Sequence, residues 1–136
     1  MANYYAHTRT NYFHVKDAKA FREFIESLSS TEGYGVELLE DKDEKGNPIF
    51  GFGCHGQPTF PEEESYEGII DVLSGLVTDD DAIIITEIGH EKLCYLVGEA
   101  IIITSKDTKE IEISSLAIET ARKMLNKADW QTKNEY

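Results

Sequence analysis

Residues 82–113, AIIITEIGHEKLCYLVGEAIIITSKDTKEIEI, hold the most apolar stretches of the chain and decide its fold class. Isoleucine, valine, threonine and tyrosine dominate these stretches, which is typical of β-strands. We predict three consecutive strands, over residues 82–88, 93–104 and 109–113, that form a meander. Gly89 is expected to turn the chain after the first strand. Gly98 predicts a bulge or a second turn within the long middle strand.

Two amphipathic helices precede this meander. Asp17 is a predicted N-cap, and apolar side chains follow it at helical spacing. They are Phe21, Phe24, Ile25 and Leu28. The apolar stripe of the second helix consists of Ile69, Val72, Leu73, Leu76 and Val77. Further strands are predicted over residues 8–15, 34–39 and 48–54, and residues 56–64 are predicted to form a loop in which two prolines prevent a regular ladder.

A third helix is predicted after the meander, capped by Ser114 or Ser115. The side chains expected to face inward from it are Ala117, Ile118, Ala121, Met124 and Leu125. The element order is therefore β-α-β-β-α-β-β-β-α, in one α+β domain of residues 1–136. We expect a single antiparallel or mixed sheet with helices packed on one face. The first six elements match a ferredoxin-like βαββαβ core, extended by a hairpin and the C-terminal helix.

Charge is the unusual property of this chain. The formal net charge is −13, beyond the magnitude of roughly 2–8 that keeps a small domain soluble. Residues 31–81 carry fourteen acidic side chains and two lysines, a net charge of −12, so most of the excess lies in this segment. Such a field repels nucleic acid and anionic membranes and attracts cationic surfaces. The sequence therefore predicts a basic protein partner, and neither direct nucleic-acid binding nor membrane binding.

The acidic side chains of this segment are the predicted partner-binding residues. They are Glu37, Glu40, Asp41, Asp43, Glu44, Glu62, Glu63, Glu64, Glu67, Asp71, Asp79, Asp80 and Asp81. Carboxylates on alternate residues of a strand recur at about 6–7 Å, close to the spacing of phosphates along a DNA strand. A surface of this kind could occupy the DNA-binding groove of a basic nuclease. The alternative is that the acidic surface only keeps the protein soluble and monomeric.

The GHEKLC stretch, residues 89–94, contains the residue types of a metal or catalytic site. A helical zinc-protease motif needs a second histidine four residues after the first, but Cys94 follows His90 at that distance. In an extended strand the two side chains lie about 13 Å apart, too far to share a metal. Cys54 and His55 are adjacent, so a strand would point them to opposite faces. We therefore predict no metal site and no cofactor, and interpret both cysteines as small core residues.

A narrower role is left for the same stretch. His90, Glu91 and Lys92 are expected to form an exposed contact tip at a strand connection.

No basic, apolar leader is visible at the start of the sequence, and two cysteines without framework spacing suit a reducing compartment, so we expect a cytoplasmic protein. Nothing in the sequence selects an oligomeric state.

Four stretches carry a resemblance to a known group of proteins. They are TRTNYFHVKD from Thr8, FGFGCHG from Phe50, GHEKLCYLVGEAIIIT from Gly89 and SSLAIETARKML from Ser114. Together they resemble a family of small acidic proteins, mostly uncharacterised, that bacterial mobile elements and prophage-like regions encode. The resemblance supplies no catalytic residues. It implies a context in which accessory proteins inhibit host defence, as antirestriction and anti-CRISPR proteins do.

Three hypotheses follow from these observations. The leading one is a non-enzymatic interaction protein that inhibits a basic nucleic-acid-handling defence protein through residues 31–81, by phosphate mimicry. The second is an immunity-type protein that neutralises a basic toxin by the same electrostatic means. The third is a small enzyme or ligand-binding domain with a site near His90 and the Cys54–His55 pair, which requires one pocket to contain both segments.

Overall fold

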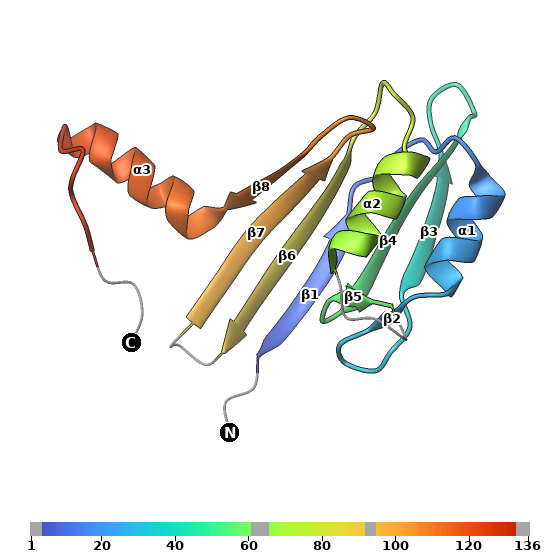
Figure 1. Ribbon diagram of the computed structural model, residues 1–136, viewed down its shortest axis with the longest axis horizontal. Helices are drawn as coiled ribbons and strands as arrows, with labels where there is room; N and C mark the ends of the chain where they lie inside the picture. The colour runs from blue at the N-terminus through green and yellow to red at the C-terminus, as the bar shows by residue number, and fades with distance from the viewer. Residues whose placement is uncertain (1–3, 61–65, 92–94, 133–136) are drawn as a thin grey trace.

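The computed structural model describes residues 4–60, 66–91 and 95–132, and its main feature is a six-stranded sheet. The strands lie side by side in the order β3 (Glu37–Lys42), β4 (Pro48–His55), β1 (Tyr5–Thr10), β6 (Ile83–Glu91), β7 (Tyr95–Ile103) and β8 (Thr108–Glu112) (Figure 1). Every neighbouring pair in this sheet is antiparallel. The predicted α+β class with a single antiparallel sheet is confirmed.

The strand order also matches the predicted ferredoxin-like core. Strand β4 lies between β1 and β3, and β1 lies between β4 and β6, so each β-α-β unit encloses an antiparallel strand. Helices α1 (Ala18–Glu26) and α2 (Tyr66–Leu76) cover the same face of the sheet (Figure 1). Strands β7 and β8 extend the sheet beyond this core as the predicted hairpin.

Helix α1 begins where the sequence predicts. A side-chain oxygen of Asp17 accepts a hydrogen bond from the backbone N–H of Ala20 at 3.1 Å, which caps the first turn. Phe21 and Ile25 are buried from this helix against the sheet. The ring of Phe21 packs against those of Phe13 and Phe50, with centroids 5.5 and 5.4 Å away. This aromatic cluster fixes α1 over β4 and the segment that follows β1.

Two strand predictions differ from the structure in position. The first strand ends at Thr10 instead of Val15, because the side chain of Asn11 bonds the backbone of the strand beside it. Its amide donates to the carbonyl of Ala82 at 3.1 Å, and its carbonyl accepts from the N–H of Ile84 at 2.8 Å. The strand predicted over residues 34–39 lies at Glu37–Lys42, since the charged residues there pair with β4. The strand predicted over residues 48–54 is confirmed as β4.

The predicted loop over residues 56–64 contains a short strand. Strand β5 (Pro58–Thr59) pairs with β2 (Ser29–Ser30), and the two form a separate small sheet. Proline is tolerated here because the ladder is only two residues long and lies at an edge. The prediction that the prolines exclude any ladder is therefore wrong.

The glycine predictions in the meander are also wrong. Gly89 forms no turn: strand β6 continues through it to Glu91, and Gly89 pairs with Ala6 and Val97. A Cβ at Gly89 would lie 2.7 Å from the carbonyl oxygen of Tyr5, so glycine permits a close approach of backbone. Gly98 forms no bulge, since β7 is continuous in register with β6.

Helix α3 (Ile113–Leu125) departs most from expectation. It starts directly after β8, and no side chain caps its N-terminus, so neither predicted serine cap forms. The prediction that five of its side chains face inward is wrong, because no residue of α3 is buried. Figure 1 shows α3 projecting beyond β8, away from the face that α1 and α2 cover. Within the part of the chain that the structure describes, no helix is long and apolar enough to cross a membrane.

Candidate functional site

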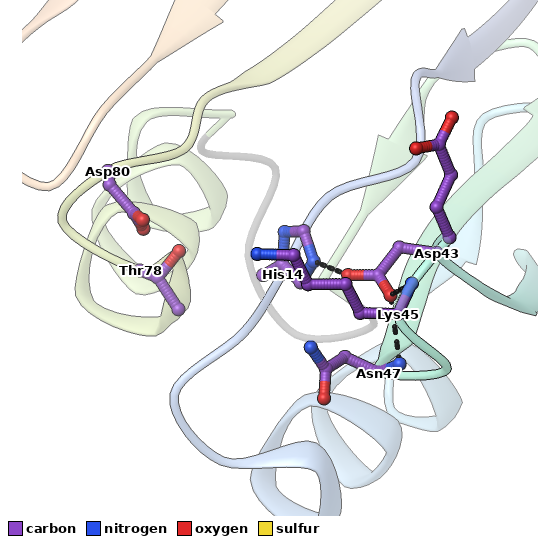
Figure 2. Close-up of a pocket in the computed structure, with 7 residues that line it drawn as sticks. His14, Asp43, Lys45, Asn47, Thr78 and Asp80 are labelled. Atoms are coloured by element: carbon purple, nitrogen blue, oxygen red, sulfur yellow. Dashed lines mark hydrogen bonds and ion pairs between the residues drawn. The ribbon is translucent and has the colours of Figure 1, made fainter.

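Three connections meet at one end of the sheet and form the best-defined polar site. They are the segment between β1 and α1, the turn between β3 and β4, and the loop between α2 and β6. Figure 2 shows His14 at their centre, pointing toward Asp43 on one side, with Thr78 and Asp80 on the opposite wall. The hollow between them has a volume of about 530 Å³. Its lining consists of His14, Asp43, Glu44, Lys45, Asn47, Thr78 and Asp80.

The backbone places His14 in this position. Val15 forms a β-bridge with Val77, and the N–H of Lys16 donates to the carbonyl of Leu76 at 2.8 Å. These contacts attach the segment after β1 to the end of α2. His14 therefore faces the loop that begins at Thr78.

The turn between β3 and β4 fixes the carboxylate of Asp43. Gly46 adopts a positive φ of 82°, which glycine reaches without steric cost, and this closes the turn. One oxygen of Asp43, Oδ1, accepts the backbone N–H groups of Lys45 and Asn47, both at 2.9 Å. The other oxygen, Oδ2, lies 2.8 Å from Nε2 of His14.

Asp81 holds the opposite side of the imidazole. Its Oδ2 lies 2.8 Å from Nδ1 of His14 and accepts the backbone N–H of the same residue at 2.8 Å. Its Oδ1 accepts the backbone N–H of Ala82 at 2.8 Å. We refer to His14, Asp43 and Asp81 as the histidine clamp, because one imidazole joins two loops that lie far apart in the sequence.

The protonation state of the clamp follows from this geometry. Both ring nitrogens face carboxylate oxygens, which accept and cannot donate when ionised, so the arrangement favours the doubly protonated imidazolium. The hydrogen bonds to Asp43 and Asp81 raise the pKa of His14 above its ordinary value of 6.5. The hydrogen bond from His14 lowers the pKa of Asp43 to about 2, and the backbone N–H groups of the turn add to this effect. Partial burial alone would raise the pKa of Asp81, but its hydrogen bonds from His14 outweigh burial and lower it.

The clamp is built for structure and charge placement. A general base needs an imidazole nitrogen with an available lone pair. Each nitrogen of His14 is held at 2.8 Å by a carboxylate, so neither is available to take a proton from a substrate. The clamp instead fixes two acidic loops next to each other. Sequence reasoning missed His14, since nothing in the spacing of residues 14, 43 and 81 indicates their contact.

Five of the predicted partner-binding residues come together around the clamp. We call them the acidic end: Asp43, Glu44, Asp79, Asp80 and Asp81. Two lysines lie among them, since Lys45 lines the hollow and the ammonium group of Lys16 lies 3.2 Å from Asp79. The acidic end thus has five carboxylates against Lys16, Lys45 and the imidazolium of His14. The distances to His14 and Lys16 place Asp43, Asp81 and Asp79, whereas Glu44 and Asp80 are exposed.

The other predicted acidic residues are placed elsewhere. Glu67 and Asp71 are exposed on α2, one helical turn apart. On β3, Glu37 and Asp41 are exposed, whereas Glu40 accepts a hydrogen bond from Nε of Arg22 at 2.6 Å. Glu62, Glu63 and Glu64 lie outside the described residues. The thirteen residues predicted from charge therefore do not all share one cluster.

Two of the three residues of the predicted contact tip, His90 and Glu91, lie within the described residues. His90 is exposed near the end of β6, with its ring centroid 5.9 Å from that of Tyr5, and Glu91 ends the strand. Lys92 and Cys94 lie outside the described residues. His90 belongs to the face of the sheet that α1 and α2 leave uncovered, which we call the open face.

The Cys54–His55 pair divides between the two faces of the sheet, as its position in a strand predicts. His55 pairs with His7 on the open face, where their Nδ1 atoms lie 3.0 Å apart. Cys54 pairs with Thr8 on the opposite face, where Thr8 is buried. Burial and the charge of Glu87 raise the pKa of the Cys54 thiol to about 11, which suppresses the thiolate. Cys54 and His90 therefore do not form a nucleophile and base.

A second group of carboxylates went unpredicted. Glu87, Glu99 and Glu112 lie opposite one another on β6, β7 and β8. Burial, together with the charges of neighbouring glutamates, raises the pKa of Glu99. Glu87 is only 6% exposed, and it accepts hydrogen bonds from the hydroxyl of Tyr4 and the amide of Gln57, both at 2.6 Å. The sequence does contain a signal for the burial of Glu87: it follows Ile83 and Ile85 at a spacing of two residues, which points all three side chains to the same face of the sheet.

Comparisons with known proteins add no identity. No protein-family model, curated protein or solved structure matches this chain. Across residues 4–60, 66–91 and 95–132, no three histidine, cysteine, aspartate or glutamate side chains form a group that could hold a metal ion. The acidic end, with the histidine clamp at its centre, is therefore the surface on which a functional proposal rests.

Proposed function

We propose that this protein is a non-enzymatic acidic binding domain that inhibits a basic nucleic-acid-handling protein of host defence. The acidic end is the proposed contact surface, and the exposed carboxylates Glu67 and Asp71 on α2 add to it. The observation that carries the proposal is the histidine clamp, which joins the two loops of the acidic end through contacts of 2.8 Å. Loops fixed before binding lose little conformational entropy in the complex, and this favours affinity.

The charge of the chain supports the partner class. A net charge of −13 accelerates association with a positive surface and disfavours acidic partners. Sites that bind DNA or RNA phosphates are rich in lysine and arginine, so a cluster of rigid carboxylates complements them. The resemblance to accessory proteins of bacterial mobile elements supports an antirestriction or anti-CRISPR role within this class. An immunity-type protein against a basic toxin would use the same surface and is the second candidate.

The third hypothesis, a small enzyme, has less support. It places a site near His90 and the Cys54–His55 pair. His55 shares the open face with His90, whereas Cys54 lies on the opposite face. The raised pKa of Cys54, about 11, also disfavours a thiolate nucleophile at neutral pH.

The test compares inhibition by three forms of the protein. Purified type I restriction endonuclease and guide-loaded Cas9 serve as probes of the two proposed classes, and DNA cleavage is the readout. The acidic-end variant carries Glu44→Gln, Asp79→Asn and Asp80→Asn, all within the acidic end. The control variant removes three negative charges elsewhere, by Glu23→Gln, Glu26→Gln and Glu32→Gln, all at exposed positions.

At low salt, we expect the wild type and the control variant to inhibit DNA cleavage by one of the two probes. The acidic-end variant should lose most of this inhibition. Raising the ionic strength should weaken binding, since exposed charges are screened over about 8 Å at physiological salt. Equal inhibition by the two variants would exclude the acidic end as the contact surface. For a toxin partner, protection of cells against a basic nuclease toxin replaces the cleavage readout, with the same three forms.

A further inference from the structure

Helix α3 presents an apolar surface that nothing in the described chain covers. Ile113, Leu116, Met124 and Leu125 are all exposed, Met124 by 82%. Ser115, Glu119 and Arg122 occupy the opposite side of the helix, whereas Lys123, seven residues after Leu116, lies next to that side chain, so α3 is amphipathic by sequence. An amphipathic helix in water gains its stability from packing of the apolar side. In this chain, that side has no partner among the described residues.

The open face of the sheet is apolar as well. Ile88 and Leu96 are each 65% exposed, and Ile84 and Ile111 are also exposed. Ile84, Ile88 and Leu96 lie on neighbouring strands β6 and β7, and a hollow of about 370 Å³ beside β1 is lined partly by Ile84 and Ile88. Clustered exposure of this kind marks an interaction surface, whereas single exposed apolar residues are normal.

The helix and the open face are joined but cannot cover one another within one chain. Ile113 lies over Gly98 of β7, with its Cγ2 3.1 Å from the position of an added Cβ, so α3 starts on the open face. Strand β8 ends at Glu112 and α3 begins at Ile113, so no linker residue is present to turn the helix back. Figure 1 shows the result: α3 extends outward from β8 instead of across β7 and β6.

We propose that a second copy of this chain covers both surfaces. In a two-fold symmetric dimer, α3 of each copy lies across the open face of the other copy, and the same patch serves both partners. The exposed parts of the eight apolar side chains add up to on the order of 800 Å², the amount that each partner contributes to a stable interface of standard size.

The charge of α3 differs from that of the rest of the chain. Residues 113–127 carry three basic residues and one acidic residue, a net charge of +2, in a chain whose net charge is −13. Over α3 and the two residues after it, this positive charge offsets part of the repulsion between two chains of net charge −13. On the open face, the basic side chains of Arg9 and Lys109 are available to pair with Glu119, the single acidic residue of α3.

The experiment measures mass by light scattering during gel filtration over a concentration series. Wild type is expected at twice 15.4 kDa, shifting to 15.4 kDa on dilution. The arm variant, Leu116→Glu with Met124→Glu, and the sheet variant, Ile88→Glu with Leu96→Glu, should each weaken the dimer roughly 30-fold or more, as loss of a hot-spot side chain does. The control variant, Ser115→Glu with Lys19→Gln, changes the charge by the same amount on the polar side of α3 and on α1, outside both apolar surfaces, and should dimerise as wild type does.

Mixing the arm variant with the sheet variant gives the decisive result. In a reciprocal dimer, one of the two contacts in the mixed pair joins an intact helix to an intact sheet, so a heterodimer should form where neither variant dimerises alone. Three outcomes would overturn the proposal: a monomeric wild type at every concentration, a sheet variant that dimerises normally, and a mixture that stays monomeric. All substituted side chains are exposed in the monomer, and circular dichroism spectra that match the wild type show that each variant is folded.

Discussion

Glu87 offers the sharpest test of how the centre of the sheet is held together. Its carboxylate is buried and accepts the hydroxyl of Tyr4 and the side-chain amide of Gln57, both at 2.6 Å. Tyr4 precedes β1, and Gln57 lies between β4 and β5. A single side chain on β6 therefore ties two other parts of the chain to the sheet. Replacement by alanine removes both acceptor oxygens and leaves both donors without this partner.

The magnitude follows from the two bonds and the lost packing. Each hydrogen bond contributes about 1 kcal/mol, and both donors are partly accessible to water, so the penalty stays near the low end of the range for unsatisfied groups. The lost methylene contacts add about 1 kcal/mol. Relief of repulsion with Glu99 acts in the opposite direction. Glu87→Ala should therefore cost about 2–3 kcal/mol, a substantial part of a total stability of about 5–15 kcal/mol.

Glu87→Gln is the matched control, since the amide keeps the shape and one acceptor oxygen. We expect it to cost about 1 kcal/mol or less. Urea unfolding at pH 7, followed by circular dichroism, should show a lower midpoint with an unchanged slope for both variants. If the alanine variant is as stable as the glutamine variant, the two hydrogen bonds do not stabilise the sheet by the expected amount.

Three further predictions concern charge and capping. The clamp raises the pKa of His14 above 6.5, so its contribution to the stability of the fold is complete below pH 6.5 and is lost as the pH rises through the raised value. The same contribution also decreases below pH 3.8, because Asp43, with a pKa of about 2, becomes protonated there. His14→Asn should therefore lower the melting temperature most between these two pH values and least at alkaline pH, in scanning calorimetry across a pH series. The raised pKa of Glu99 means that the folded state disfavours its ionised form, so the stability of the fold decreases as the pH rises from 4.5 through the raised value. Glu99→Gln should therefore increase the urea midpoint at pH 7 and leave it little changed at pH 4. Asp17→Ala removes the cap of α1 and should cost about 1 kcal/mol in urea unfolding, whereas Asp17→Asn, which keeps an acceptor, should cost much less.

Local patterns in the sequence predict most of the sheet. Ile83 and Ile85 alternate with exposed residues, and that period of two marks both the position of β6 and its inward face. Asp17 followed by Phe21 and Ile25 likewise marks the start and the buried side of α1. These signals depend on neighbours within a few residues, so one sequence is enough to interpret them.

The errors concern contacts between distant segments. The sequence around Gly89 and Gly98 predicts a turn and a bulge, which are the common local uses of glycine in strands. Each instead makes room for something remote in sequence, the backbone of Tyr5 for one and the side chain of Ile113 for the other. The histidine clamp is of the same kind. His14 meets Asp43 and Asp81 only because β1 lies between β4 and β6 in the sheet.

The inward side of α3 was a different error. The spacing of Ala117, Ala121 and Met124 predicts an amphipathic helix correctly, but periodicity does not say which chain covers the apolar side. The prediction assumed that the same chain does so. A side chain exposed by 82%, such as Met124, shows that this assumption fails for the monomer.

The proposed dimer changes what the acidic end could do. The open face and α3 form the proposed interface, whereas the acidic end lies at the connections between β1 and α1, β3 and β4, and α2 and β6 (Figure 1). The proposed dimer therefore leaves both copies of the acidic end accessible. Two accessible sites on one particle make the second binding event intramolecular when the partner is itself multivalent, which can strengthen binding by a factor of about 10²–10⁴. The arm variant, Leu116→Glu with Met124→Glu, should therefore bind a sparsely immobilised partner as wild type does and dissociate much faster than wild type from a densely immobilised one. Equal dissociation of the two forms at high density would show that the acidic ends act singly, whatever the oligomeric state.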